Sequence, residues 1–448
     1  MKSKGLLIAT IVLAALSGAL YWSNHHPPSD DTAKASLDTP PKILTLKQED
    51  IARLSIKRKD GAEVALAKND SGKWQITAPK PLGADQDSVS SVLSTVSSLS
   101  SDRLVDDKPT DLGQFGLTKP ELEVSITEKD TKSQRLLVGD NTPTGSAAFA
   151  KLEGDPRVFT IAGYNKTSID KTANDLRDKR LLTTDFEKVS QIDVITKKQT
   201  IAFGRNKQEW QIVKPRPLRA DNSQVEDLVR SLRDAKLEAP ADDADAKKVA
   251  SAFASATLVG TAKITDSSGT QQLELRKNKD TFYAKSSTVA GVYKVSGDLN
   301  TSLNRTLDDF RNKKLFDFGY DDPSKVEVHD GAKAYFLTKG GQDWWGPDGK
   351  KMDTVSAQSL IDKVRSLTAN KFADSGFTSP VLDMTVISND GKRVERVRIS
   401  KSGEKWIGIR ENEPSLYEID SNSITDLQKA AGDLKAAEPP KPAQPAKK

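Results

Sequence analysis

The chain has 448 residues, of which 29% are charged and 6% aromatic, and its 68 basic and 63 acidic side chains leave a net charge of +5. The two signs of charge are interspersed, so the sequence lacks the basic stripe and the aromatic stacking surfaces expected of a nucleic-acid-binding protein. It contains no cysteine and only three histidines, which excludes thiol chemistry, disulfides and a histidine-rich metal site. We therefore expect no nucleic-acid partner, no metal and no cofactor.

Residues 1–22 are expected to be a membrane anchor or a signal peptide. Two lysines precede an uncharged, mostly apolar run over 5–22, which is at the lower length limit for a membrane-spanning helix. The basic flank predicts that this end stays in the cytoplasm and that the following chain is exported. A retained inner-membrane anchor is favoured over a cleaved signal peptide, because the apolar run continues past the small residues at 17–19. Both alternatives place residue 23 onward in the periplasm.

Six segments are predicted along the chain. Residues 1–22 are the anchor or signal, 23–42 a polar linker with four prolines, 43–185, 186–319 and 320–435 three repeat units, and 436–448 a disordered tail rich in proline, alanine and lysine. A length of 448 residues corresponds to about three domains, in agreement with the number of repeats.

Each repeat unit is predicted to contain three strands, a helix, four strands and a closing helix. In the first unit, alternating apolar residues predict strands over 51–56, 63–66 and 74–76, helical spacing follows over 89–99, and further strands are expected at 122–126, 136–138, 149–151 and 158–159. The same order recurs in the second and third units, and closing helices are expected at 176–182, 310–316 and from residue 434. Short turns between the strands favour an α+β fold with mainly antiparallel sheet.

Tryptophan and aspartate recur together with a period of about 135 residues, far above the repeat length of solenoids. The pairs are Trp74 with Asp85, Trp210 with Asp221, and Trp345 with Asp353. Each aspartate directly precedes a helical pattern, which predicts an N-terminal cap, and Gln224 gives Asp221 the spacing of a capping box. The tryptophans stand between apolar neighbours on strands and are expected to be core residues. The recurring pairs therefore predict structure and not catalysis.

Two features break the pattern and are candidate partner contacts. Neighbouring residues of a strand face opposite sides, so one of Trp344 and Trp345 should point outward, toward a partner or a sugar. The second feature is a pair of basic clusters at the unit junctions, Arg177, Lys179 and Arg180, and Arg311, Lys313 and Lys314. They are expected at helix C-termini, where cations complement the helix dipole, and could dock an acidic partner.

Other polar motifs do not combine into a catalytic site. The segment 139–145 contains two glycines but matches neither dinucleotide- nor phosphate-binding loops, so it is expected to be a turn. His329 stands alone and is expected on the surface. With 63 acidic residues a carboxylate pair for hydrolysis stays possible, but no pair stands out, and we expect no catalytic residues.

With these residues, the chain resembles the bacterial domain-of-unknown-function family numbered 4340. The motifs are Trp74-Gln75-Ile76, Pro79, Ala84-Asp85, Gly116-Leu117-Thr118-Lys119-Pro120 and the Arg177–Leu181 segment, with Gly376–Pro380 as a later counterpart of the glycine-to-proline element. The second unit lacks that element. The resemblance implies membrane-anchored proteins often encoded with ABC-type transporters, including gliding-motility-like auxiliary components, and it supplies no catalytic residues.

Three functions follow as hypotheses. The favoured one is a non-enzymatic, membrane-tethered periplasmic accessory or scaffold protein of an ABC-type transport or surface-assembly system, with transporter subunits or other envelope proteins as partners. The alternative is a module that binds envelope polysaccharide through the tryptophan doublet. An uncharacterised hydrolase is the third.

Overall fold

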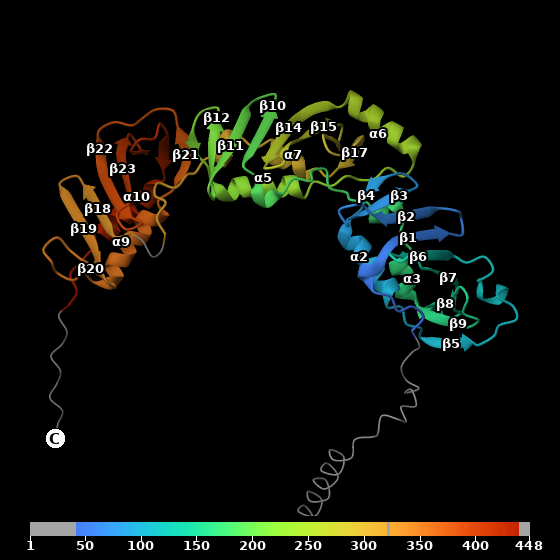
Figure 1. The fold of residues 1–448 in the computed structure, drawn as a ribbon. Coiled ribbons are helices and arrows are strands. Elements are labelled where there is room, and N and C mark those ends of the chain that lie inside the picture. Colours follow the sequence, from blue (N-terminus) through green and yellow to red (C-terminus); the bar gives the residue numbers. More distant parts are fainter. Residues whose placement is uncertain (1–41, 320–322, 439–448) are drawn as a thin grey trace, which may run out of the picture. The chain divides into compact units, whose positions relative to one another are not determined.

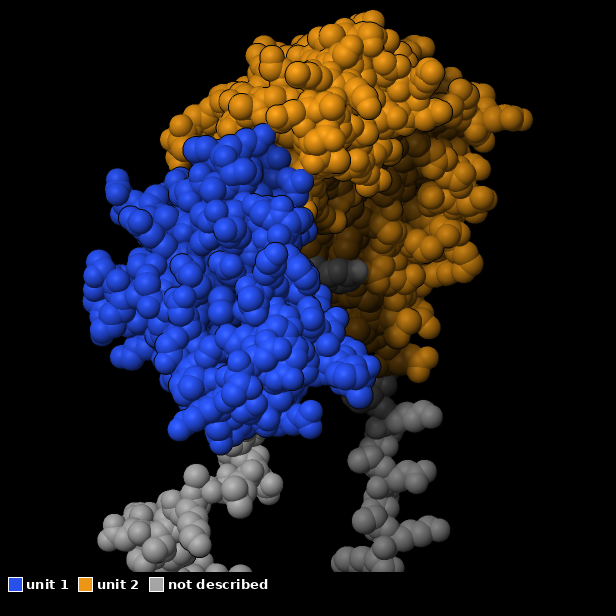
Figure 2. All heavy atoms as spheres, turned by 90° about the vertical axis from the view of Figure 1, so that its right-hand side faces the viewer, with its two compact units in different colours: residues 1–178 blue, residues 179–448 orange. Residues whose placement is uncertain are grey.

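The computed structural model describes residues 42–319 and 323–438 (Figure 1). The predicted anchor, nearly all of the predicted linker and most of the tail lie outside the described residues. Among the residues that are described, no helix is long and apolar enough to cross a membrane. The chain divides between Asp178 and Lys179 into two compact units, which Figure 2 draws in separate colours.

The first unit holds one nine-stranded antiparallel sheet, in the order β4-β3-β2-β1-β6-β7-β8-β9-β5. Its strands are β1 (Ile51–Arg58), β2 (Glu63–Lys68), β3 (Trp74–Ala78), β4 (Leu82–Gly83), β5 (Arg103–Asp106), β6 (Leu122–Glu128), β7 (Ser133–Asn141), β8 (Ala147–Leu152) and β9 (Val158–Ala162). Its helices are η2 (Gln48–Asp50), α2 (Gln86–Ser97), η3 (Gly113–Phe115), α3 (Gly163–Ile169) and α4 (Ala173–Leu176). Two meanders therefore meet at the central pair β1 and β6.

The second unit holds two further sheets, in which the central strands follow the same order as in the first. The second sheet runs β13-β12-β11-β10-β14-β15-β16-β17, from β10 (Gln191–Thr196), β11 (Thr200–Asn206), β12 (Glu209–Lys214), β13 (Leu218–Arg219), β14 (Thr257–Asp266), β15 (Gly269–Asn278), β16 (Thr281–Ser286) and β17 (Val292–Val295). Its helices are η4 (Phe186–Lys188), α5 (Asn222–Arg233), α6 (Asp243–Ser255), α7 (Asp298–Leu303) and α8 (Leu307–Phe310).

The third sheet runs β20-β19-β18-β22-β23-β24-β25-β21. It comprises β18 (Lys325–Asp330), β19 (Lys333–Gly340), β20 (Asp343–Trp345), β21 (Ala369–Ala373), β22 (Pro380–Ser388), β23 (Arg393–Ser402), β24 (Lys405–Arg410) and β25 (Leu416–Ile419), with helices α9 (Thr354–Ser366) and α10 (Ser421–Gly432). We call each sheet with its helices a repeat. The α+β class, the antiparallel sheets and the repeated unit are confirmed, while the predicted ranges of the units stay predictions.

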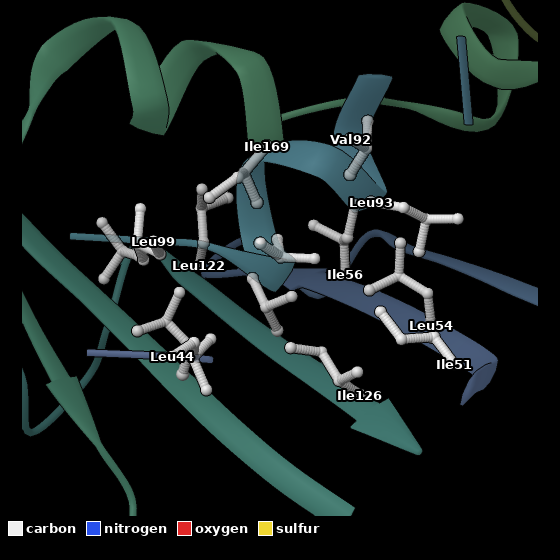
Figure 3. Packing of buried hydrophobic residues seen from close by; sticks show 14 of the residues in the cluster. Leu44, Ile51, Leu54, Ile56, Val92, Leu93, Leu99, Leu122, Ile126 and Ile169 are labelled. Atoms are coloured by element: carbon white, nitrogen blue, oxygen red, sulfur yellow. The ribbon is translucent and has the colours of Figure 1, made fainter. Parts of the chain in front are cut away.

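One face of each sheet carries a main hydrophobic core under the helices. In the first repeat, Leu54, Ile56, Val92 and Leu93 from β1 and α2 are fully buried together, as Figure 3 shows. Alternate residues of the strands enter this core, as the period of two in a strand requires. Each of the other two repeats has its own such core.

The opposite face of each sheet is covered locally by a segment that differs from repeat to repeat. In the first repeat Phe115 and Leu117, around η3, pack with Val158. In the second repeat α6 occupies the corresponding part of the chain, and its Phe253 packs with Tyr283. In the third, the loop at Gly376 approaches Ile407, which is buried. The first and third coverings are the predicted glycine-to-proline elements, and α6 stands where the second repeat lacks one.

The predicted closing helices over 176–182, 310–316 and from residue 434 are wrong. The helices α4 and α8 end at Leu176 and Phe310, and α10 ends at Gly432. The chain then extends because its carbonyls bond elsewhere: Leu176 O and Phe310 O accept hydrogen bonds from the caps of α2 and α5. The residues that follow α4 and α8 run into the main core of the next repeat, to which Leu182 and Phe316 belong.

We call residues 42–44, 180–182 and 314–316 the lead-in segments, because each opens a repeat. Ile43, Leu181 and Leu315 each donate a backbone hydrogen bond to a carbonyl that lies one or two residues after α2, α5 or α9. Their side chains lie in the main core of the same repeat. Lys42, Arg180 and Lys314 each form an isolated β-bridge at the equivalent place in their repeat. Of the six basic residues at the junctions, Arg180 and Lys314 are thus part of a segment that recurs in all three repeats.

Candidate functional site: the joint between the second and third repeats

The three recurring aspartates are helix caps. The carboxylates of Asp85 and Asp353 accept hydrogen bonds from Ser88 N and Ser356 N at 2.8 and 2.9 Å, and that of Asp221 accepts from the N–H groups of α5. The capping prediction is confirmed. The reciprocal half of the capping box at Asp221 is not formed, because Asp221 N donates to Phe310 O instead.

The tryptophans that recur in the cores are Trp74, Trp210 and Trp344. Their exposed fractions are 7%, 2% and 8%, whereas Trp345 is 37% exposed. The doublet therefore splits between the two faces of β20, as predicted, and the residue that matches Trp74 and Trp210 is Trp344 and not Trp345. The strand register supports this assignment, since Trp74, Trp210 and Trp344 pair with Lys68, Arg205 and Lys339 of the adjacent strands.

Two of the six basic residues proposed for docking are buried. Arg177 is 6% exposed and Arg311 8%, and they directly follow α4 and α8 as C-caps. Lys179 and Lys313 are half-buried, while Arg180 and Lys314 are exposed. A surface role is thus geometrically open to Arg180 and Lys314 but not to the two buried arginines.

Arg311 joins the second repeat to the third. Its guanidinium donates to the carboxylate of Asp308 in α8 and to Ser415 Oγ in the third repeat, both at 2.8 Å. The same group lies 3.3 Å from the ring centroid of Phe372 in β21. A planar guanidinium can make these contacts together, which a lysine cannot. Arg311 therefore ties the end of one repeat to the sheet of the next.

A cluster of alternating charges surrounds this contact. Arg410 Nε lies 2.7 Å from Glu413 Oε1, and Arg410 also pairs with Glu395 at 3.0 Å. From the second repeat, Arg219 pairs with Asp317, and its Nε lies 3.3 Å from Glu413 Oε1 without the alignment of a hydrogen bond. Buried charge pairs add little net stability but strongly disfavour arrangements that separate them. The cluster is therefore suited to fixing the alignment of the two repeats.

Burial and charge shift two pKa values in this cluster. Burial alone would lower the pKa of Arg410, but the nearby carboxylates of Glu413, Asp317 and Glu395 raise it above its ordinary value. Burial raises the pKa of Tyr417 to about 12, and its hydroxyl donates to Glu413 Oε2 at 2.9 Å. Both groups therefore keep their protons over the whole physiological range.

A small cleft of about 220 Å³ lies at the surface of the joint. The second repeat lines it with the end of β12 and the β13 edge, and the third repeat with the turn between β24 and β25. The lining residues are Gln211, Ile212, Pro217, Leu218, Arg219, Asn412, Glu413, Pro414 and Ser415. The edge of one repeat thus receives an acidic, proline-containing turn of the next.

The residues that directly follow the two lead-in segments of the second unit make the same backbone hydrogen bond to different acceptors. Thr183 N donates to the amide oxygen of Gln271 at 2.8 Å, and the corresponding Asp317 N donates to the carboxylate of Glu395 at 3.1 Å. The same backbone bond is therefore made once with a neutral and once with a charged acceptor. The sequence reasoning missed Arg219, Glu395, Arg410 and Glu413, because they stand on strands and turns without periodicity. Aligning the repeats with each other would have revealed Gln271 against Glu395.

The remaining motifs have structural explanations. The turn predicted over 139–145 is wrong for residues 139–141, which belong to β7, and the turn spans 142–146. A side chain at Gly139 would lie 2.1 Å from Phe115 O, so that glycine allows close packing. His329 is exposed on β18, as predicted for a surface residue, with its ring 5.5 Å from that of Phe336. Among the described residues, no three His, Cys, Asp or Glu side chains are grouped so that they could hold a metal ion.

The sequence profile of the family described as Domain of unknown function (DUF4340) matches residues 74–250 and again residues 210–385, so that the matches span well over half of the 448 residues. The chain belongs to this family. The two DUF4340 matches start at Trp74 and Trp210, and each runs through one lead-in segment into the following repeat. The family pattern therefore includes the junction itself. No curated protein and no solved structure matches the chain.

Proposed function

We propose that the protein is a non-enzymatic, membrane-tethered periplasmic accessory protein that acts as a docking scaffold, with an ABC-type transport or surface-assembly system as its partner. The observation that carries the proposal is the joint built around Arg311. A buried guanidinium with three partners from two repeats favours a body of fixed alignment. Fixed alignment is what a spacer or scaffold needs, because a flexible one would pay entropy on each contact.

The recurring aspartates and tryptophans support this proposal, because each of them has a structural role. Asp85, Asp221 and Asp353 cap helices, while Trp74 and Trp210 fill cores. The membrane tether rests on the sequence of residues 1–22, with its basic flank and apolar run.

The test is co-purification from membranes. The full chain, carrying a C-terminal affinity tag, would be crosslinked in cells, solubilised in mild detergent and purified, and its partners identified by mass spectrometry. The proposal predicts recovery of ABC-type transporter subunits in a fixed ratio to the chain. Recovery of no membrane protein would contradict it.

A second candidate function is binding of envelope polysaccharide, favoured by the exposure of Trp345. An indole that is 37% exposed can stack on the apolar face of a sugar ring. This alternative predicts saturable binding of purified envelope glycans by the full chain and its loss in Trp345→Gln. Undiminished glycan binding by that variant would remove the alternative.

A further inference from the structure

The third repeat ends in an edge that has the same backbone construction as the joint edge of the second repeat. In the second repeat Ala220 bridges Arg311, and Asn312 N donates to Arg219 O at 3.0 Å. In the third repeat Met352 bridges Ala436, and Ala437 N donates to Lys351 O at 2.9 Å. We call the residues Trp345, Lys351, Met352, Val355 and Ala436 the terminal edge.

The terminal edge keeps the basic residue that pairs with the acidic turn in the second repeat. Arg219 pairs with Gln211 across β12 and β13, and Lys351 forms the corresponding bridge with Trp345. Lys351 lies 2.9 Å from Asp343 and is 47% exposed at its side chain. Its ammonium group is thus accessible at the place where Arg219 approaches Glu413.

Two positions of this edge are polar in the first and second repeats and apolar in the third. The position of Trp345 is Gln75 in the first repeat and Gln211 in the second. The position of Val355, which is 78% exposed, is two residues after the capping aspartate; there Asp87 and Ser223 stand in the first and second repeats. Among the residues that the structure describes, no repeat covers this edge of the third sheet. An uncovered edge that becomes more apolar than its counterparts indicates a binding surface.

Trp345 is held in place on this edge. A side-chain carbon added at Gly340 would lie 2.7 Å from Trp345 Nε1, so the indole packs directly on the backbone of that glycine. A fixed aromatic side chain loses little conformational entropy on binding, and tryptophan is enriched among the residues that dominate protein interfaces. In the second repeat, Gln211 and Pro414 line the same cleft, so the aromatic ring occupies a position suited to stacking on a proline.

We propose that the terminal edge binds an acidic, proline-containing β-turn of a protein partner, in the way that the second repeat binds the turn at Glu413-Pro414. Trp345 stacks on the proline and Lys351 pairs with the carboxylate. The bulky buried arginine of the internal joint is replaced by Ala436, so the partner's turn needs no counterpart of Phe372. The inference rests on the proposed docking function and names the surface and the chemistry of its partner.

The test uses the full chain in detergent, labelled with 5-fluorotryptophan, and a cyclised hairpin peptide with the sequence of residues 405–419 as the probe. The chain contains six tryptophans, and we expect saturable movement of the one fluorine resonance that is missing from the spectrum of Trp345→Gln. Peptide binding by that variant, measured by titration calorimetry, should be weaker by about tenfold or more. Val213→Gln removes another exposed apolar side chain, 50% exposed, and should leave binding unchanged. Lys351→Glu should weaken binding, and a peptide carrying Glu413→Lys should restore it.

Several results would overturn the inference. The first is the absence of saturable movement of the resonance, and the second is unchanged peptide binding in Trp345→Gln. The third is a stronger response to envelope oligosaccharides than to the hairpin. The fourth is movement of the resonance when the chain alone is concentrated, which would indicate binding of a second copy. Hairpin binding that appears only after deletion of residues 439–448 would identify the tail as the occupant. If Trp345→Gln co-purifies the same transporter subunits as the wild type, the docking function stands while this inference fails.

Discussion

At the residue scale, the recurring aspartates connect sequence directly to stability. Each carboxylate satisfies backbone N–H groups that the first turn of a helix leaves without partners. Their positions at Asp85, Asp221 and Asp353 explain why the motif recurs although the surrounding surface residues differ. In this chain the recurring acidic residue thus marks the start of a helix.

Asp221→Ala should lower the free energy of unfolding of the second unit by about 1 kcal/mol, because two N–H groups of α5 lose their acceptor. Urea denaturation followed by circular dichroism measures the change, with Asp221→Asn as a control that retains an acceptor. Recovery of transporter subunits in the co-purification should stay as in the wild type. A variant that loses its partner at unchanged stability would show that Asp221 has a binding role.

Tyr417 should make stability depend on alkaline pH. Its pKa is about 12 in the folded chain, above the ordinary value of 10.0, so the folded state holds the phenol proton more tightly than the unfolded state. The stabilisation is therefore complete below pH 10 and is lost as the pH rises toward 12. Unfolding by urea at several pH values, compared with Tyr417→Phe, measures it. If the free energy of unfolding changed equally with pH in the wild type and in Tyr417→Phe between pH 10 and 12, Tyr417 would not be the group responsible.

At the scale of elements, the joint depends on Arg311 and the charges around it. Arg311→Met retains an apolar stem but removes the hydrogen bonds to Asp308 and Ser415 and the cation over Phe372. We expect a loss of roughly 1–3 kcal/mol at the joint and a wider range of distances between the second and third repeats, with the cores intact.

Spin labels can measure this prediction without interference, because the chain contains no cysteine. Labels at the exposed positions 248 and 392 report the separation of the two repeats by electron double resonance. Arg230→Met is the matched control, since that arginine is 61% exposed at its side chain and pairs only within α5. A distance distribution as narrow in Arg311→Met as in the wild type would show that the joint does not depend on Arg311.

The sequence predicted the elements whose side chains follow a period and failed where tertiary contacts decide. Alternation over 51–56 and helical spacing over 89–99 identified β1 and α2, because burial on one face imposes the period. Residues 176–182 look helical by spacing alone, yet Leu181 and Leu182 belong to the core of the next repeat. No local signal distinguishes a short helix followed by an extended lead-in from one longer helix.

The candidate site was predictable only in part. Neighbouring side chains of a strand must face opposite sides, so the sequence predicted that one of Trp344 and Trp345 is exposed, and Trp345 is. Arg311 was selected for its charge, but its burial depends on Phe372 and Ser415, which are 61 and 104 residues away along the chain. Such distant contacts are invisible to spacing within one repeat.

At the scale of the whole molecule, one unit is used three times and its differences carry the information. The order of the central strands and the caps are shared. The edge strands, the covering segment, the charges next to the lead-in segments and the residue at the position of Trp345 vary. Shared positions serve folding. Function is therefore expected where the copies differ, above all at the terminal edge of the third repeat.

The most direct test of the docking account is site-specific photo-crosslinking in intact cells. A benzophenone side chain placed at position 345 reports neighbours of the terminal edge, and one at position 213 reports an exposed apolar position of the second repeat. We expect position 345 to crosslink to a subunit of an ABC-type transporter and position 213 not to do so. Equal crosslinking at both positions, or none at position 345, would contradict the docking account.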